Sequence, residues 1–443
     1  MTRTIRILVL AVTLLVVPPV AATVSAQEEM TVEDAIRIGL ENNYSIRIAR
    51  NSAEIARNNE GRGTAELLPT LDASGNHTYS STDEETNSPF SFGDSDTRAS
   101  GASVALNWTL FDGFRMFAEE SRYDELARLG EYQARLTIEN TVVTITRAYY
   151  DLVQQEQLLD VARRTRDISR ERLNKEEVRN ELGGASSTDF LNARVAFNND
   201  QATLLNQELA VTLARQELNL QLGREPDVPV TVSKQITIPP LQLQQEQVLE
   251  RAEERNAALL VAQQNKRVAD DLVNSQRSTF FPRISLNAEY GYSDRTTSSA
   301  NPDFEQDIET QATDASIGLI ASWNLFNGGR DKIAYDNARI EAINRHLELR
   351  DTRNRLVGQV RRTLEQFAKR LELVELETQN VMAAEQNLAL QQDRYRIGAA
   401  TSLEFRDAQV NLSRAQNALI VARYQARITR LELDQLIGNI QID

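Results

Sequence analysis

The sequence predicts a mainly α-helical protein in which long coiled-coil helices carry four β-strands, and in which this arrangement occurs twice. Three observations predict this fold class: an internal repeat, long stretches of heptad spacing, and short segments in which apolar and polar residues alternate. The chain has 443 residues, a formal net charge of −15 and 41% hydrophobic residues. It contains no cysteine and two histidines. We therefore expect no enzymatic activity, no metal site and no cofactor, and the acidic surplus argues against a nucleic-acid partner.

The internal repeat is the strongest signal in the chain. Residues 107–115 (NWTLFDGFR) align with residues 322–330 (SWNLFNGGR), and the segments 182–190 and 397–405 superpose at the same offset of 215 residues. The sequence thus predicts a first repeat at 27–223 and a second at 247–443. Between them, residues 224–246 contain four prolines and are expected to form a linker.

The first 26 residues have the layout of a secretory signal. Two arginines precede an apolar stretch at 7–17, and the small-residue sequence Val24-Ser25-Ala26 is a cleavage site. Cleavage would leave Gln27 as the first residue of an exported protein. No later stretch is apolar enough for a transmembrane helix.

Alternating segments predict strands near 70–80, 103–112, 283–293 and 316–327, paired across polar loops at 81–101 and 294–313. One interpretation is a soluble sandwich sheet; the other is part of an outer-membrane β-barrel, whose strands are about this long. No remaining segment is available to cover the apolar face, which favours the barrel. Four strands cannot close a barrel, because the smallest has about eight, so the chain must oligomerise. The side chains expected to face lipid are Trp108, Leu110, Trp323 and Leu325.

Unbroken helical patterns cover 115–181 and 330–396, about 100 Å each at roughly 1.5 Å per residue. Shorter helices are expected before each long helix (34–66 and 247–279) and after it (189–222 and 404–437). One preceding and one following helix, stacked end to end, would have the length of one long helix. Two heptad series lie on nearly opposite faces of the first long helix: Leu129, Leu136, Val143 and Tyr150, and Ile138, Ile145, Leu152 and Leu159. Two opposite seams require a neighbour on each flank, as in a ring of helices around a lumen.

The duplicated Leu-Phe-x-Gly elements at 110–113 and 325–328 and the glycine-containing tips resemble the TolC-like outer-membrane efflux proteins, over nearly the whole mature chain. This resemblance implies a homotrimer, with twelve strands forming one barrel in the bacterial outer membrane and twelve helix columns forming a periplasmic tunnel. It also implies a periplasmic adaptor protein and an inner-membrane transporter as partners. The chain would be a passive exit duct for a drug, a metal or a protein, and the transporter would select the substrate.

The resemblance also assigns roles to the tips at 182–189 and 397–404. In the family such tips contact the adaptor, and their small residues allow close approach of a partner hairpin. The corresponding residues are Gly183, Gly184, Ser186, Gly398, Ala399 and Thr401.

The family places acidic residues at the narrow periplasmic entrance, which assigns a gate to Glu404, Asp407 and Asp189. Thr401-x-x-Glu404 and Ser186-x-x-Asp189 also match capping boxes, so both acids have an alternative, structural role. Asp407 has no such alternative. The second tip has Ala399-Ala400 where an arginine would be needed to pair with Asp189, which leaves Tyr395 to bond across the tips. The rival interpretation of the chain is a secreted coiled-coil scaffold without channel activity.

Overall fold

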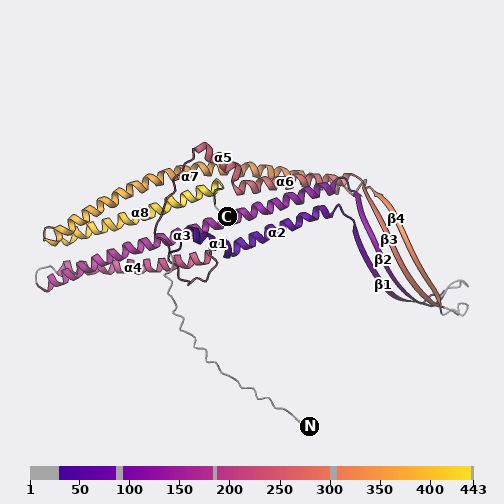
Figure 1. Cartoon of the computed structure of the whole chain (residues 1–443), viewed down its shortest axis with the longest axis horizontal. Helices are drawn as coiled ribbons and strands as arrows, with labels where there is room; N and C mark the ends of the chain where they lie inside the picture. The colour runs from indigo at the N-terminus through magenta and orange to yellow at the C-terminus, as the bar shows by residue number, and fades with distance from the viewer. Residues whose placement is uncertain (1–28, 86–92, 183–186, 300–306, 441–443) are drawn as a thin grey trace, which may run out of the picture.

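The computed structural model describes residues 29–85, 93–182, 187–299 and 307–440. The expected signal segment 1–26 and the tip residues Gly183, Gly184 and Ser186 lie outside the described residues. The molecule is elongated, with paired helices over most of its length and a curved sheet at one end (Figure 1). None of the helices in the described part of the chain has the length and apolarity needed to cross a membrane.

The sheet has four antiparallel strands in sequence order: β1 (Thr70–Thr82), β2 (Ser95–Phe111), β3 (Arg283–Ser299) and β4 (Ile308–Ser322). The strands run 13 to 17 residues, longer than the ten expected. The reason is that residues with hydroxyl side chains, expected in the loops, pair between the strands. The hydroxyl oxygens of Thr97 and Thr297, for example, are 3.2 Å apart. β4 ends at Ser322, so Trp323 and Leu325 lie beyond the strand on which they were predicted.

The two faces of the sheet differ in polarity. On one face the register aligns Val104 with Tyr290 and Ala315; on the other it aligns Asp72 with Ala105, Glu289 and Ser316. The apolar face extends along β3 from Ile284 to Tyr292, which is about 20 Å at roughly 3.3 Å per residue and a tilt of about 40°. That height approaches the apolar band of a membrane barrel, about 25 Å. In the described part of the chain no helix covers this face (Figure 1).

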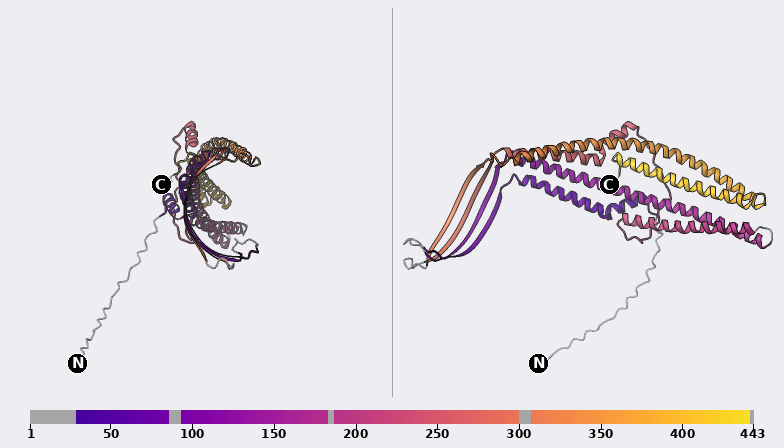
Figure 2. Two further views of the ribbon diagram at one scale, coloured as in Figure 1. Left: turned by 90° about the vertical axis from the view of Figure 1, so that its right-hand side faces the viewer. Right: turned by 180° about the vertical axis from the view of Figure 1, so that it is seen from behind.

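The two long helices, α3 (Arg115–Glu181) and α7 (Arg330–Arg396), contain 67 residues each, as predicted. They return as α4 (Ser187–Gln221) and α8 (Ser402–Leu436). Near the sheet the helix order is α2 (Tyr44–Ala65), α3, α6 (Ala257–Arg277), α7; near the tips it is α4, α3, α8, α7. α3 thus has a neighbour on each flank, as its two heptad series predict. Along the long axis the subunit is an open arc (Figure 2).

The expected continuous helices at 34–66 and 247–279 are each broken at an asparagine. α1 (Val32–Asn42) ends before Asn43, and α5 (Gln245–Arg255) ends before Asn256. Asn43 Oδ1 accepts from Ser45 N at 2.8 Å while its Nδ2 donates to Gln221 O at 2.8 Å. This one side chain caps α2 and joins it to the end of α4, so α2 and α4 form one column. α1 is not part of that column.

Asn256 repeats this arrangement at the junction of α6 and α8. Its Oδ1 accepts from Leu259 N at 3.1 Å, and its Nδ2 donates to Leu436 O at 3.2 Å. The short 3₁₀ helix η1 (Ser278–Phe280) follows α6 and leads into β3.

Replacing Asn43 with Ala removes both the helix cap and the bond to the end of α4. We expect a loss of about 1–2 kcal/mol in the free energy of unfolding of the helical column, because a cap and a buried hydrogen bond disappear together. Denaturant unfolding followed by circular dichroism measures this loss. Asn43→Ser is the matched control: its hydroxyl keeps a capping oxygen without adding a charge, so a loss equal to that of the alanine variant would show that the cap contributes nothing.

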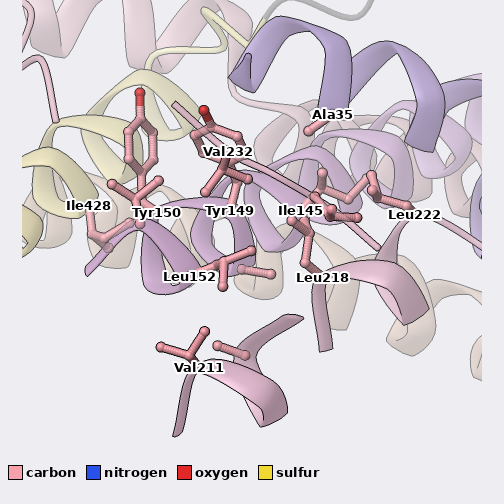
Figure 3. Close-up of a cluster of buried hydrophobic side chains, with 14 of the residues drawn as sticks. Ala35, Ile145, Tyr149, Tyr150, Leu152, Val211, Leu218, Leu222, Val232 and Ile428 are labelled. Carbon is pink, nitrogen blue, oxygen red and sulfur yellow. The ribbon is translucent and has the colours of Figure 1, made fainter. Parts of the chain in front are cut away.

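Figure 3 shows a close-up of the main core of buried hydrophobic side chains. α1, α4, α8 and the linker meet α3 there, and the linker contributes Val232, whose backbone bridges to Met30. A second core occupies the equivalent place in the other half. Ala35, Ile145 and Leu218 of the first core correspond to Val248, Val360 and Leu433 of the second, so the duplication is present in the packing as well as in the sequence.

Candidate functional site

The second tip joins α7 to α8 through a tight glycine turn. Gly398 has φ +79°, the left-handed conformation that glycine adopts without strain. Gly398 N donates to Tyr395 O at 3.2 Å and Ala399 N donates to Arg394 O at 2.8 Å, which is the Schellman pattern of a helix C-terminus. Gly398 and Ala399 are both exposed. The tip therefore presents small residues to its surroundings.

Glu404 forms the predicted capping box with Thr401. Thr401 N and Oγ1 donate to Glu404 Oε2 at 2.7 and 2.8 Å, and Glu404 N donates to Thr401 Oγ1 at 3.2 Å. The hydrogen bond from the Thr401 backbone, followed by that from its hydroxyl, lowers the pKa of Glu404. The carboxylate is therefore charged and exposed at the tip. It also caps the first turn of α8, which is the alternative, structural role expected for it.

Asp407 is one turn further along α8 and is exposed. In contrast to Glu404, its side chain makes no hydrogen bond or ion pair to any other described residue of the chain, so its charge is free to act on the surroundings. Asp189 is exposed in the first turn of α4. Its expected capping partner Ser186 lies outside the described residues.

A charged connection between the two hairpins lies just behind the tips, and sequence reasoning missed it. Arg406 on α8 binds Asp200 on α4 in a bidentate pair, with NH1–Oδ2 at 2.6 Å and NH2–Oδ1 at 2.9 Å. Ser169 of α3 donates to Asp200 and is fully buried. Gln409 adds a bond from its Nε2 to Thr165 O at 2.8 Å. Two oppositely charged, largely buried groups thus link the two halves of the subunit.

Tyr395 bonds across the hairpins, the role that the sequence left open for it. Its hydroxyl donates to Glu176 of α3, and its ring stacks on Phe405 at a centroid distance of 5.1 Å. Lys175 Nζ lies 4.1 Å from the same ring. Burial, together with the bond to Glu176, raises the pKa of Tyr395 to about 12, so the phenol stays a proton donor at neutral pH.

No local pattern in the sequence singles out this connection, because the positions seven, fourteen and twenty-one residues after Arg406 are a mixed series of Ser, Ile and Arg. In the structure Arg406 is partly buried against α3, where its NH1 donates to Ser169 Oγ at 3.1 Å. A cation at such a position needs a buried anion. The identity of the anion, Asp200, depends on the relative height of two helices that are remote in sequence.

The side chains predicted to face lipid are all exposed at the helical end of the sheet. Trp108 Nε1 donates to Leu67 O at 2.9 Å, and Trp323 Nε1 donates to Phe280 O at 3.3 Å. Each indole thus ties the end of a returning strand to the connection that begins its partner strand. Leu110 lies where the register between β2 and β3 shifts, and Leu325 lies beyond β4.

Comparison with known proteins identifies the family. A family model described as outer membrane efflux protein matches residues 35–224 and 248–439. The outer membrane protein TolC of Escherichia coli is 22% identical over 401 residues, covering 88% of this chain and 78% of the relative. The alkaline protease secretion protein AprF of Pseudomonas aeruginosa is 24% identical over 396 residues, covering 88% and 81%.

Solved structures share the fold. The CmeC outer membrane channel of Campylobacter jejuni superposes with a TM-score of 0.81 at 14% identity, covering 92% of this chain and 85% of that chain. The outer membrane protein VceC of Vibrio cholerae superposes with a TM-score of 0.78 at 18% identity, covering 92% and 96%. Since the family model covers both halves, the chain belongs to the outer membrane efflux protein family and is a TolC-like outer-membrane channel, a transport protein and not an enzyme.

Proposed function

We propose that three copies of this chain close into a passive exit duct that crosses the outer membrane and narrows at the helix-hairpin tips. The open arc formed by the single subunit is the main support for this proposal (Figure 2). Among the described residues, β1 and β4 each have one edge that pairs with no other strand. Within lipid, an unpaired strand edge leaves backbone groups unsatisfied, so the edges must be paired by other copies. Three copies supply twelve strands, and the number three rests on the family.

The edges of the helical layer support the same closure. α2, on one edge, exposes Ile48 and Ile55; α7, on the other, exposes Ile333, Ile340 and Leu347. On both helices these residues recur every seven positions, which is the spacing of a coiled-coil seam. We infer that α7 of one copy packs against α2 of the next.

At the tips, three copies would bring Glu404, Asp407 and Asp189 together as rings of carboxylate around the entrance. Such rings favour cations and narrow the passage. Opening would be a relative movement of the two hairpins, which the pairs Arg406–Asp200 and Tyr395–Glu176 hold together. The capping role of Glu404 is compatible with this, because its carboxylate stays exposed.

We further propose that the tips receive a periplasmic adaptor, which links the duct to an inner-membrane transporter. The contact residues would be Gly183, Gly184, Ser186, Gly398, Ala399 and Thr401, whose small size lets a partner hairpin approach closely. The transporter would set the substrate.

Sedimentation of the purified chain in detergent tests the closure. We expect a single species containing three chains. A monomer in detergent, or a protein that stays dispersed without detergent, would instead favour a coiled-coil scaffold that forms no channel.

A further inference from the structure

We propose that Phe114, on the connection between β2 and α3, is a membrane anchor whose ring lies between the acyl chains and the headgroups of the phospholipid leaflet on the helical side of the outer membrane. The residue has no part in the duct or its gate. Phospholipid occupies the surface around this ring.

The backbone of Phe114 is strained. Its φ is 71° and its ψ is 11°, and it is the one non-glycine residue with positive φ in the described part of the chain. At the equivalent position of the second repeat the chain has Gly329, with φ 81°. The connection thus folds in the same way with glycine, which has no Cβ to strain. A bulky residue kept in this conformation indicates a role for its side chain.

The ring lies on the apolar side of the sheet. Phe111 pairs with Ile284, which is on the face that aligns Trp108 with Leu286 and Leu319. The Phe114 ring packs edge-to-face on Phe111, with centroids 5.2 Å apart, yet Phe114 remains 60% exposed. A second edge-to-face contact joins it to Phe281, with centroids 6.4 Å apart. Large aromatic side chains are thus gathered on the lipid side and left uncovered by the chain itself.

The position of Phe114 along the molecule fits the depth of the headgroups. The apolar face begins at Ile284 and runs away from the helices toward Tyr292. Phe114 lies just past its helical end, so it is continuous with the lipid-facing band of the channel. Aromatic side chains are favoured at this depth. The next residue, Arg115, is exposed and the first turn of α3 contains no acidic residue, so a cation is available to a lipid phosphate.

A second copy of the chain does not reach this surface. Phe111 and Phe281 flank the two inner strands, β2 and β3, and α3 is an inner helix of the layer. Copies meet at β1 and β4 and at the outer helices. The remaining neighbour on the apolar side of the inner strands is lipid.

Depth measurement with a spin label tests the proposal, because a chain without cysteine accepts a single label cleanly. Phe114→Cys carrying a nitroxide would be reconstituted in vesicles of phosphatidylethanolamine and phosphatidylglycerol. We expect collisions with oxygen to dominate over collisions with a water-soluble nickel chelate. Leu182→Cys, exposed at the far end of the same helix, is the control and should show the opposite preference. A Phe114 label as open to nickel as the control, or shielded from both reagents, would overturn the proposal.

A second variant avoids the label. Phe114→Gly relieves the strain and removes the ring, so its Tm in detergent should equal or exceed that of the wild type. The rise in Tm on transfer from detergent to the same vesicles should be smaller than for the wild type. An equal rise would mean that the ring contributes nothing to the membrane contact. Phe114→Leu, which keeps an apolar side chain, should retain part of the rise.

Discussion

Replacing Glu404 and Asp407 together with Ala is expected to raise the single-channel conductance several-fold in a planar lipid bilayer and to weaken the preference for cations. The double variant removes two carboxylates from each chain, so the proposed trimer would lose six negative charges and six side chains at its proposed entrance. Smaller side chains widen the entrance, and fewer fixed charges reduce the attraction of cations. The measurement is the current through single reconstituted channels together with the reversal potential in a salt gradient.

The single variants separate the two roles of the acids. Asp407→Ala should produce most of the change in cation preference, because Asp407 has no partner in the described structure. Glu404→Gln keeps an acceptor oxygen for the helix cap but removes the negative charge. It therefore separates the effect of the charge from the effect of capping. Asp393→Ala is the matched control: this exposed tip acid is already paired with Arg396 at 2.7 Å. Unchanged conductance and cation preference in the double variant would remove both acids from the gate.

Arg406→Ala is expected to cause the largest loss of stability at the tips, about 3–5 kcal/mol, since it leaves the Asp200 carboxylate buried without its cation. Asp200 is 9% exposed and would keep one hydrogen bond, from the hydroxyl of Ser169, with the buried Arg172 as the remaining cation nearby. The second hairpin should separate from the first, so the channel should conduct more. Thermal unfolding reports the stability. Distances between nitroxides at Asn174→Cys and Gln392→Cys report the separation of the hairpins.

The double variant Arg406→Ala with Asp200→Ala supplies the control. Removing both charges leaves no uncompensated group, so much of the lost stability should return while the hairpins remain less tightly linked. Equal stability of wild type and Arg406→Ala would show that the pair does not hold the hairpins together.

The fold was largely predictable because it is periodic. The heptads of α3 required a neighbour on each flank, and the alternation near Trp108 and Trp323 required a sheet with one apolar face. The breaks at Asn43 and Asn256 were not predicted, because each depends on a hydrogen bond to a helix end about 180 residues away. The greater length of the strands was missed for a similar reason. Thr97 and its neighbours have the composition of a polar loop, and only their pairing with β3 shows that they are part of a strand.

The candidate site was predictable only where its contacts are local. The capping box of Thr401 and Glu404 spans one helical turn, so the spacing alone identifies it. The Arg406–Asp200 pair and the Tyr395–Glu176 bond join helices more than 200 residues apart in sequence. Their partners depend on how two hairpins are aligned in height, which no local pattern specifies. Phe114 is a third case: its strain becomes visible only when the backbone conformation is known.

Cadmium block of Asp407→Cys channels in a planar bilayer tests whether Asp407 lies at the constriction of a trimeric channel. Three cysteines that converge on the axis can share one cadmium ion. We expect micromolar cadmium to block the current of this variant, a chelator to restore it, and the cysteine-free wild type to be unaffected. A current that cadmium leaves unchanged would place Asp407 away from the constriction.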